Sequence, residues 1–296
     1  MWEPEPGWQR LSGGMGASTV GVWRDGDRVA KRIEAPLRGD PADLSDPSHF
    51  AWWRRAAEIA ASGLVDETPG LRAPACLGID EDQDGITLWQ EYVEPVALPG
   101  PFLARALGRF AGTPLPEVSW LARNQLADRL ARIERRGGWT TLARTTVADV
   151  ADRLWTRRPV HLATLDALPR VLQHGDPVPA NLISRAGEDV VAIDWSTLGV
   201  GAVGADLGYL SLTAREDFAV LAEAYADGLP SGVATPTEVV HGARINAVYT
   251  AVSRAEWALA RVAGGPGALA GKYRHPSVAP YLRSLQRLFA QVEALL

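Results

Sequence analysis

The chain has 296 residues, of which 47% are hydrophobic and 22% charged, a balance typical of a globular protein with a sizeable core. Its net charge of −5 argues against a nucleic-acid-binding protein, which usually carries a basic face. Cys76 is the only cysteine, so a disulfide framework and a cysteine-based zinc site are excluded. The sequence shows neither the regions of a signal peptide nor the roughly 20 consecutive apolar residues of a membrane span. We therefore expect a cytoplasmic protein with no nucleic-acid or membrane partner.

The amino-terminal region has the pattern of three short strands, at 8–11, 19–23 and 28–33, with the hairpin signal Asp-Gly before the third. The turn between the first two strands reads SGGMGAS, and a glycine-rich turn lets backbone N–H groups approach phosphates closely. Gly13, Gly14 and Ser18 are therefore candidate nucleotide-binding residues. No Walker lysine follows, and a strand rather than a helix comes next, which disfavours a Rossmann fingerprint. A flexible hairpin turn without a ligand remains the alternative.

Lys31 lies in the third predicted strand, where alternation puts it on the same face as Val29 and Ile33. A lysine on an apolar face is costly unless its ammonium meets an anion. Only two of the 30 basic residues are lysines. In a chain that uses arginine almost everywhere, a lysine at this position indicates a function that arginine would not fulfil. Its slim stem and point charge suit phosphate oxygens of ATP, whereas the alternative is an edge-strand charge that discourages aggregation.

The next segment, 36–47, is rich in Pro, Gly and Asp and has the composition of a loop. Ser48 is positioned to cap a helix over 50–62 that ends at Gly63. Glu58 is the only carboxylate in this helix and hence the available partner for Lys31. A solvent-facing charge near neighbouring arginines is the alternative.

Two further strands, at 73–79 and 86–93, flank the acidic turn EDQDG. After them the composition changes, which places a lobe boundary near 94–99 and predicts a nucleotide-binding lobe over 1–95 and a catalytic lobe over 96–296. Backbone groups at the boundary, from Glu91 to Val93, are candidates to contact an adenine edge. Helices are expected at 99–111, 117–136, 146–156, 204–212, 215–227, 235–263 and 276–295.

The strongest functional signal is VLQHGDPVPANLI at 171–183, followed by VVAIDW at 190–195. An apolar strand-like run ends at His174, Asp176 and Asn181 follow in a proline-broken loop, and a β-branched run then ends at Asp194. Two short strands that close near one another would bring these two carboxylates and the amide into one cleft. That set serves metal-assisted phosphoryl transfer, with one carboxylate at the attacking hydroxyl and an amide and a carboxylate on Mg²⁺.

Together, HGDPVPANLI, AIDW and GADLGYL make the chain resemble the aminoglycoside phosphotransferase and choline kinase family. The resemblance implies an α+β, bilobal, protein-kinase-like fold, with an amino-terminal antiparallel sheet, one main helix beside it and a larger, mostly helical carboxyl-terminal lobe. Carried over by position, Asp176 resembles the catalytic base, Asn181 and Asp194 the magnesium ligands, and Lys31 the phosphate-binding lysine, with His174 and Asp206 as structural support. The family's helical glutamate would fall near Ala56, and Glu58 is roughly 200° away around a helix.

Only twelve positions separate Asp194 from Asp206, and no Ala-Pro-Glu motif follows, so the chain lacks room for the activation segment of a protein kinase. The predicted acceptor is therefore the hydroxyl group of a small molecule, with ATP or another nucleoside triphosphate and Mg²⁺ as cofactors. Three alternatives stay open: a kinase of an antibiotic of the aminoglycoside or nucleoside type, a kinase of a primary metabolite such as choline, an amino sugar or homoserine, and a non-catalytic nucleotide-binding module. The protein is expected to be a monomer or a homodimer.

Overall fold

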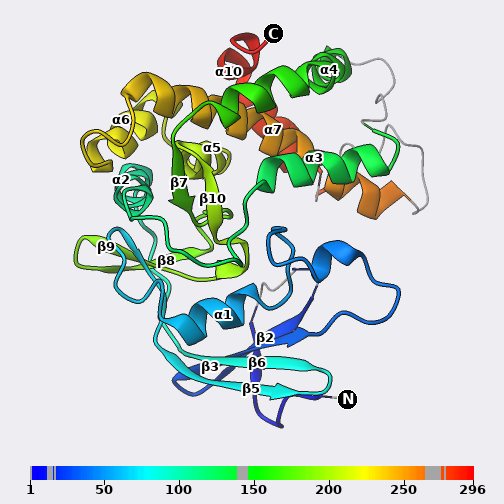
Figure 1. Ribbon diagram of the computed structural model, residues 1–296, viewed down its shortest axis with the longest axis vertical. Helices are drawn as coiled ribbons and strands as arrows, with labels where there is room; N and C mark the ends of the chain where they lie inside the picture. The colour runs from blue at the N-terminus through cyan, green and yellow to red at the C-terminus, as the bar shows by residue number, and fades with distance from the viewer. Residues whose placement is uncertain (1, 12–15, 17, 139–145, 264–274, 277) are drawn as a thin grey trace.

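A five-stranded antiparallel sheet forms the amino-terminal part of the molecule (Figure 1). The computed structural model describes residues 2–11, 16, 18–138, 146–263, 275–276 and 278–296. In spatial order the strands are β1 (Gln9–Arg10), β2 (Thr19–Asp25), β3 (Arg28–Glu34), β6 (Gly85–Glu91) and β5 (Cys76–Asp82), and each neighbouring pair is antiparallel. Gly26, at φ +58°, makes the tight turn between β2 and β3, as the Asp-Gly signal predicts.

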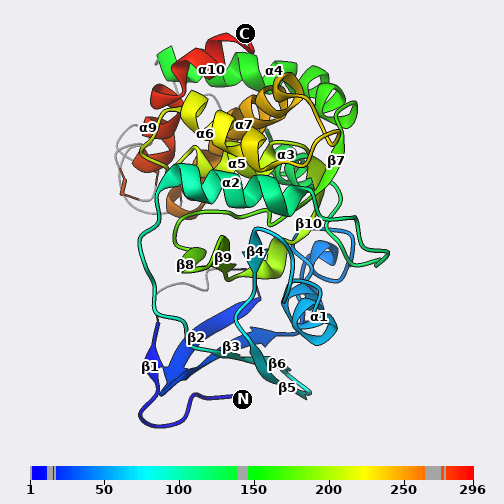
Figure 2. The same cartoon turned by 90° about the vertical axis from the view of Figure 1, so that its left-hand side faces the viewer.

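Helix α1 (Arg55–Ser62) lies between this sheet and the rest of the molecule (Figures 1 and 2). Its Ala56 packs against Ile33 of β3 and Leu88 of β6 in a small buried cluster. The sheet thus presents an apolar face to α1, and the short side chain of Ala56 keeps the helix close to the strand that carries Lys31.

The remainder of the chain is mostly helical and surrounds two small sheets. The helices are α2 (Gly100–Ala111), α3 (Gln125–Arg135), α4 (Thr146–Asp166), α5 (Ala205–Leu210), α6 (Phe218–Gly228), α7 (Pro236–Ala263), α9 (Ala279–Arg287) and α10 (Phe289–Glu293). In one sheet, β9 (Asp189–Ala192) pairs antiparallel with β8 (Leu182–Ala186) and parallel with β4 (Leu71–Arg72). In the other, β7 (Arg170–Gln173) pairs antiparallel with β10 (Gly199–Ala202).

Helices α5 and α7 pack closely because glycine lines their contact. A Cβ atom at Gly208 would lie 2.3 Å from the carbonyl oxygen of Ala243, so only glycine lets the two backbones approach this far. This contact fixes α5, which carries Asp206, against the long helix α7. Among the described residues, no helix is both long and apolar enough to cross a membrane.

The observed architecture confirms the predicted α+β, protein-kinase-like class. The division into lobes at residues 95 and 96 stays a prediction, and β4 pairs with β9 across it. Helices α2, α5, α6 and α7 match their predicted ranges to within three residues, because each is a long or strongly patterned apolar run.

The predicted helix over 50–62 begins too early, since α1 starts at Arg55. Ser48 does not cap it; its backbone N–H and Oγ both donate to Asp46 Oδ1, at 2.9 and 2.8 Å, in a local turn. The buried guanidinium of Arg55 then takes the carbonyl oxygens of Pro47, His49 and Phe50 as acceptors. These contacts hold the preceding segment in a non-helical path.

Other boundaries differ for similar reasons. Helix α3 starts at Gln125 rather than 117, because Ala122 bridges Leu198 and Val200 through backbone hydrogen bonds of 3.1 and 2.7 Å. The prediction ended α4 at residue 156, but it continues through Pro159 to Asp166. Arg158 Nη1 donates to the Trp155 carbonyl at 3.0 Å, the acceptor that the missing N–H of Pro159 leaves unused. Three strands were not predicted, namely β4, β8 and β10, and the helix expected at 276–295 is divided into α9 and α10.

Candidate active site

The loop between β7 and β8 brings Asp176 and Asn181 into contact. Asn181 Nδ2 donates to the backbone carbonyl of Asp176 at 2.9 Å and approaches its Oδ2 at 3.5 Å. The Val178 N–H also donates to the Asp176 carbonyl, at 2.8 Å. The two prolines leave few N–H groups to form regular structure, so side-chain contacts fix the loop. The Asp176 carboxylate is 22% exposed and therefore accessible to a ligand.

A buried carboxylate holds the start of this loop. Asp206 accepts the backbone N–H groups of His174 and Gly175 at 2.7 and 2.9 Å. Burial raises the pKa of Asp206, and the two N–H donors and the neighbouring histidine oppose that shift. The ring of His174, which has no exposed surface, makes a hydrogen bond of 3.0 Å with the Ile193 carbonyl. His174 and Asp206 thus link α5, the loop and the end of β9 through hydrogen bonds, and their role as structural support stays a prediction.

Lys31 and Asp194 form an ion pair between the amino-terminal sheet and the segment that follows β9. Lys31 Nζ lies 2.6 Å from Asp194 Oδ1, and Ser196 Oγ donates to the same oxygen at 3.0 Å. Chiefly through the charge of Lys31, the pKa of Asp194 is lowered to about 2, although burial opposes the shift. Asp194 stays ionised at neutral pH.

Asp194 also has an unusual backbone. Its φ is +58°, and it is the only non-glycine residue with positive φ in the described part of the chain. Such a conformation costs on the order of 1 kcal/mol and clusters at functional sites. It turns the chain sharply between β9 and the short 3₁₀ helix Trp195–Thr197, which leaves the carboxylate directed toward Lys31.

Glu58 does not pair with Lys31, and the alternative of a helix charge beside neighbouring arginines is the arrangement observed. Glu58 Oε1 accepts a hydrogen bond of 3.3 Å from Arg54 on its own helix, while Lys31 is bonded to Asp194. Ala56 instead lines the cavity beside Lys31. The helix register is the physical reason, since the position facing Lys31 carries a methyl group and Glu58 points elsewhere.

The glycine-rich turn between β1 and β2 supplied the next candidate nucleotide-binding residues. Gly13 and Gly14 lie outside the described residues. The carbonyl of Ser18 accepts the backbone N–H of Glu34 at 2.8 Å, which joins the base of the glycine turn to the end of β3.

At the predicted hinge, the Glu91 N–H donates to the Ala75 carbonyl at 3.0 Å and is therefore engaged within the protein. No hydrogen bond to the backbone of Val93 occurs among the described residues. Val93 thus retains the free backbone groups that an adenine contact needs, whereas Glu91 retains only part of them.

A cavity lies between the sheet and α1, lined among others by Lys31, Ala56, Leu88, Gln90 and Asp194. Within the ranges that the structure describes, no cluster of three or more His, Cys, Asp or Glu side chains suits a metal ion. The predicted oxygen ligands of a metal ion are Asn181 and Asp194, of which Asp194 lines this cavity. Because Asn181 directs its nitrogen to Asp176, its amide oxygen is left for another partner. Mg²⁺ fits such a sparse donor set, since it commonly takes one or two protein ligands and completes its shell with water and phosphate oxygens.

Sequence reasoning missed the residues that surround Asp176 from the helical side. Arg254 Nη2, on α7, lies 3.1 Å from Asp176 Oδ1 and also donates to the Tyr209 hydroxyl. The Gly175 carbonyl accepts from Gln125 Nε2 at 2.8 Å and from Arg129 Nη2 at 3.3 Å. An arginine within the apolar stretch of α7 is the signal that could have suggested Arg254, but its partner lies 78 residues away in the sequence.

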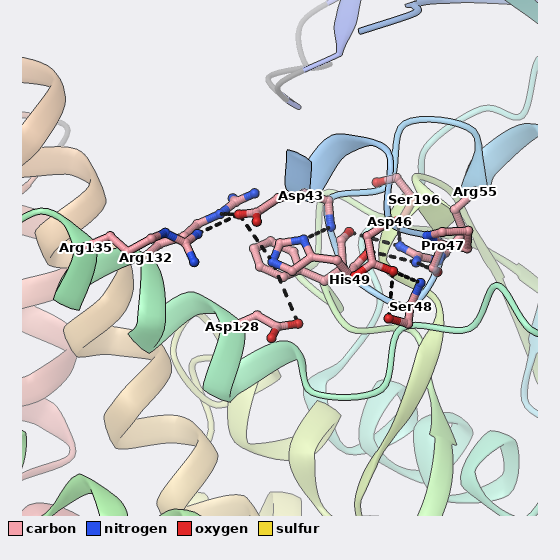
Figure 3. Close-up of polar contacts among 12 residues, drawn as sticks. Asp43, Asp46, Pro47, Ser48, His49, Arg55, Asp128, Arg132, Arg135 and Ser196 are labelled. Atoms are coloured by element: carbon pink, nitrogen blue, oxygen red, sulfur yellow. Dashed lines mark hydrogen bonds and ion pairs between the residues drawn. The ribbon is translucent and has the colours of Figure 1, made fainter. Parts of the chain in front are cut away.

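A second buried arginine supports the opposite side of the site. Arg55 makes five hydrogen bonds, all to backbone carbonyls, including those of Trp120 at 2.8 Å and Ser196 at 3.0 Å. Figure 3 shows this side chain among Pro47, His49 and Ser196. Burial lowers the pKa of Arg55 to about 10, yet it remains charged at neutral pH. It joins α1 to the segment that follows Asp194.

The fold and the family that the sequence matches identify the class of protein as a phosphotransferase. A family model described as the phosphotransferase enzyme family matches residues 7–237. The chain belongs to this family. Among curated proteins, no significant sequence match was found.

Three solved structures illustrate the shared fold. A choline/ethanolamine kinase family protein from Mesorhizobium loti has a TM-score of 0.62 and 20% identity, with 97% of this chain and 92% of that chain covered. Choline kinase LicA from Streptococcus pneumoniae has a TM-score of 0.61 and 13% identity, with 95% and 94% covered. Aminoglycoside phosphotransferase APH(3'')-Id from Streptomyces rimosus, solved with ADP and streptomycin, has a TM-score of 0.52 and 20% identity, with 81% and 92% covered.

Proposed function

We propose that the protein transfers the γ-phosphoryl group of ATP, or of another nucleoside triphosphate, to a hydroxyl group of a small molecule. The observation that carries this proposal is the joint placement of Asp176 and Asn181 in one loop with the ion pair of Lys31 and Asp194 beside it. Phosphoryl transfer requires mainly positioning and charge neutralisation, and these four side chains supply both.

Asp176 is the proposed catalytic base. The acceptor oxygen attacks the γ-phosphorus, the bond from that phosphorus to the β,γ-bridging oxygen breaks, and the nucleoside diphosphate leaves. The hydroxyl proton passes to Asp176 and then to solvent. Arg254 holds one carboxylate oxygen, which fixes the orientation of the base. In a loose transition state this orientation matters at least as much as basicity.

Lys31 is proposed to bind phosphate oxygens, and Asn181 and Asp194 are proposed to hold Mg²⁺. When bound, the metal ion neutralises the charge that develops between the β- and γ-phosphates. Before nucleotide arrives, the Lys31 ammonium is bonded to Asp194. In the nucleotide complex, Lys31 would contact phosphate oxygens and Asp194 would hold the metal ion, in place of this direct ion pair.

We propose two alternative classes of acceptor substrate for this reaction. One is an antibiotic of the aminoglycoside or nucleoside type, so that phosphorylation confers resistance, and the solved relative with streptomycin bound supports it. The other is a primary metabolite such as choline, an amino sugar or homoserine, which the choline kinase relative supports. A non-catalytic nucleotide-binding module is the alternative of another class.

Replacement of the base tests the proposal directly. Asp176→Asn should lower turnover by roughly 10²–10⁴-fold, the usual contribution of a general base, and leave the Kd for nucleotide nearly unchanged. Nucleoside diphosphate release against a panel of hydroxylated acceptors, with ATP or GTP and with or without Mg²⁺, measures turnover, and calorimetry measures nucleotide binding.

Asp227→Asn is the matched control, because Asp227 is an exposed partner of Arg105 on the outer helices. An Asp176→Asn variant with unimpaired turnover contradicts the assignment of the base. Clear nucleotide binding without turnover of any acceptor by the unaltered protein favours the non-catalytic module.

A further inference from the structure

A second cleft is lined by Arg254, the residue that contacts Asp176. Three arginines, at positions 129 and 132 in α3 and at position 136 directly after its last residue, line it together with Arg254 and Glu256 of α7 and with Phe50. The spacing of three and then four residues places these three arginines on one side of the helix. We call this feature the arginine cleft.

We propose that the arginine cleft binds an oxyanion, a carboxylate or a phosphate ester, carried by the acceptor substrate. This inference rests on the proposed phosphotransferase function and names a substrate class for it. The acceptor would present its anionic group to the arginines and its hydroxyl group to Asp176.

The charges that line the cleft are unbalanced. Four guanidinium groups face one carboxylate, Glu256. Glu256 pairs with Arg136 at 3.2 Å, and burial raises its pKa, which weakens it as a counter-ion. Arg132 is paired at 3.3 Å with Asp43, which approaches from the loop beyond the cleft (Figure 3).

Neither Glu256 nor Asp43 pairs with the other two arginines of the cleft, Arg129 and Arg254. The hydrogen bond of Arg129 goes to an uncharged acceptor, the Gly175 carbonyl, and its guanidinium lies 5.3 Å from the ring centres of Phe50 and Tyr209. Burial and the neighbouring charge of Arg254 lower the pKa of Arg129. Asp176 pairs with Arg254 at 3.1 Å, whereas no ion pair of Arg129 with a carboxylate occurs among the described residues. One carboxylate therefore serves two neighbouring cations, and a buried cation without its own counter-ion is costly.

Arg254 retains an unused donor. Its Nη2 serves Asp176 and Tyr209, but its Nε is buried and has no hydrogen-bond partner in the described part of the structure. Buried donors are nearly always satisfied, so this atom indicates a missing acceptor. A planar oxyanion matches the fork of N–H groups on a guanidinium.

The position of the cleft assigns the anion to the acceptor rather than to the nucleotide. The cavity around Lys31 and Asp194 shares no lining residue with the arginine cleft. Arg254, in contrast, contacts the proposed base at 3.1 Å. An oxyanion bound to Arg254 and Arg129 would therefore be separated from the Asp176 carboxylate, the proposed base, only by the Arg254 side chain.

Two acidic residues in and before α6, Glu216 and Asp227, are engaged with other parts of the protein. Glu216 accepts the Gly100 N–H at the start of α2 at 2.9 Å, and Asp227 pairs with Arg105 at 2.9 Å. A cationic acceptor such as choline, a quaternary ammonium, would be repelled by the arginine cleft.

The test has a binding arm that does not depend on turnover. With saturating ADP present to fill the nucleotide side, inorganic phosphate and citrate are titrated at constant ionic strength and monitored by calorimetry. Both should bind the unaltered protein, and Arg129→Gln should weaken that binding about 10–100-fold, as loss of one charge-assisted hydrogen bond does. Arg132→Gln, at a more exposed position of the cleft, gives a second reading if Arg129→Gln folds poorly. Arg105→Gln, on the outer face of α2, is the control.

The turnover arm compares hydroxylated carboxylates and phosphate esters with neutral and amine-bearing compounds of the same skeleton. We expect turnover with the anionic members, and a rise in KM for the acceptor of about 10–100-fold in Arg129→Gln with KM for ATP unchanged. Turnover confined to cationic or neutral acceptors overturns the inference and leaves the proposed function intact. Absence of phosphate and citrate binding also overturns it. Anion binding without any phosphoryl transfer supports the cleft and contradicts the phosphotransferase.

Discussion

The loop that carries Asp176, the proposed base, depends on single residues that each satisfy two partners. Asp206 accepts the N–H groups of two successive residues, and Asn181 holds the Asp176 carbonyl with its nitrogen while its oxygen stays available. Asp194 joins Lys31 and Ser196 through one oxygen. Because each of these side chains serves two purposes, a change at any one disturbs both the loop and the ligand contacts.

Asp206→Asn tests this dependence. An amide has one acceptor oxygen, so one of the two N–H groups would face an NH₂ donor in a buried site. We expect the free energy of unfolding to fall by about 2–4 kcal/mol, measured by urea denaturation. Asp217→Asn, at an exposed residue that makes no side-chain cap, should change it by no more than about 0.5 kcal/mol. Equal stabilities for the two variants contradict the role assigned to Asp206.

Much of the site could be predicted from the sequence because its residues are local. Asp176, Asn181 and Asp194 lie within one strand–loop–strand segment, and their types limit the chemistry. Lys31 stood out as one of two lysines among 30 basic residues. Arg254 could not be assigned in this way, since its contact with Asp176 exists only once α7 packs beside the loop.

At the scale of the elements, long apolar runs were predictable and boundaries set by distant partners were not. Helices α2 and α7 follow from periodicity, and the hairpin of β2 and β3 from its Asp-Gly turn. The start of α1 depends on Arg55 and the start of α3 on the backbone bridge at Ala122. Strand β4 has only two residues and forms because β9 lies beside it. No local pattern contains these partners.

Arg55→Lys tests the support of α1. Lysine keeps the charge but cannot present the planar fork that reaches five carbonyls. We expect a loss of about 2–4 kcal/mol in the free energy of unfolding, because several buried carbonyls lose their donors. The neighbouring Arg54→Lys is the control, since Arg54 pairs with Glu81 at the surface and such pairs contribute at most about 1 kcal/mol. Comparable losses in the two variants contradict the supporting role of Arg55.

At the scale of the whole molecule, a charged cluster joins the loop before α1 to helix α3. His49 Nε2 lies 3.6 Å from Asp43 and 3.8 Å from Asp128, and Arg132 and Arg135 approach the same loop (Figure 3). Burial, and then the charge of Asp43, raise the pKa of Asp128 to about 6. Burial lowers the pKa of His49.

This cluster makes stability depend on pH. Because the pKa of Asp128 is higher in the folded chain than its ordinary value of 3.8, Asp128 favours folding at low pH, and that contribution is lost as the pH rises through about 6. Asp128→Asn removes this titration. The variant should therefore gain stability relative to the unaltered protein by roughly 1–3 kcal/mol between about pH 4.5 and pH 7.5, by urea denaturation at both values. A gain that does not change with pH contradicts the shifted pKa.

The pairing of β4 with β9 constrains the order in which parts of the protein fold during synthesis. Leu71 pairs with Val190, so the ribosome completes one partner more than a hundred residues before the other. At roughly 5–20 residues per second, that interval is on the order of 6–24 seconds. During it the amino-terminal sheet can form, because all five of its strands precede residue 92. Lys31, however, cannot yet form its ion pair, because Asp194 has not been synthesised. The proposed active centre is thus assembled late in synthesis, when β9 emerges and pairs with β4, which was synthesised earlier.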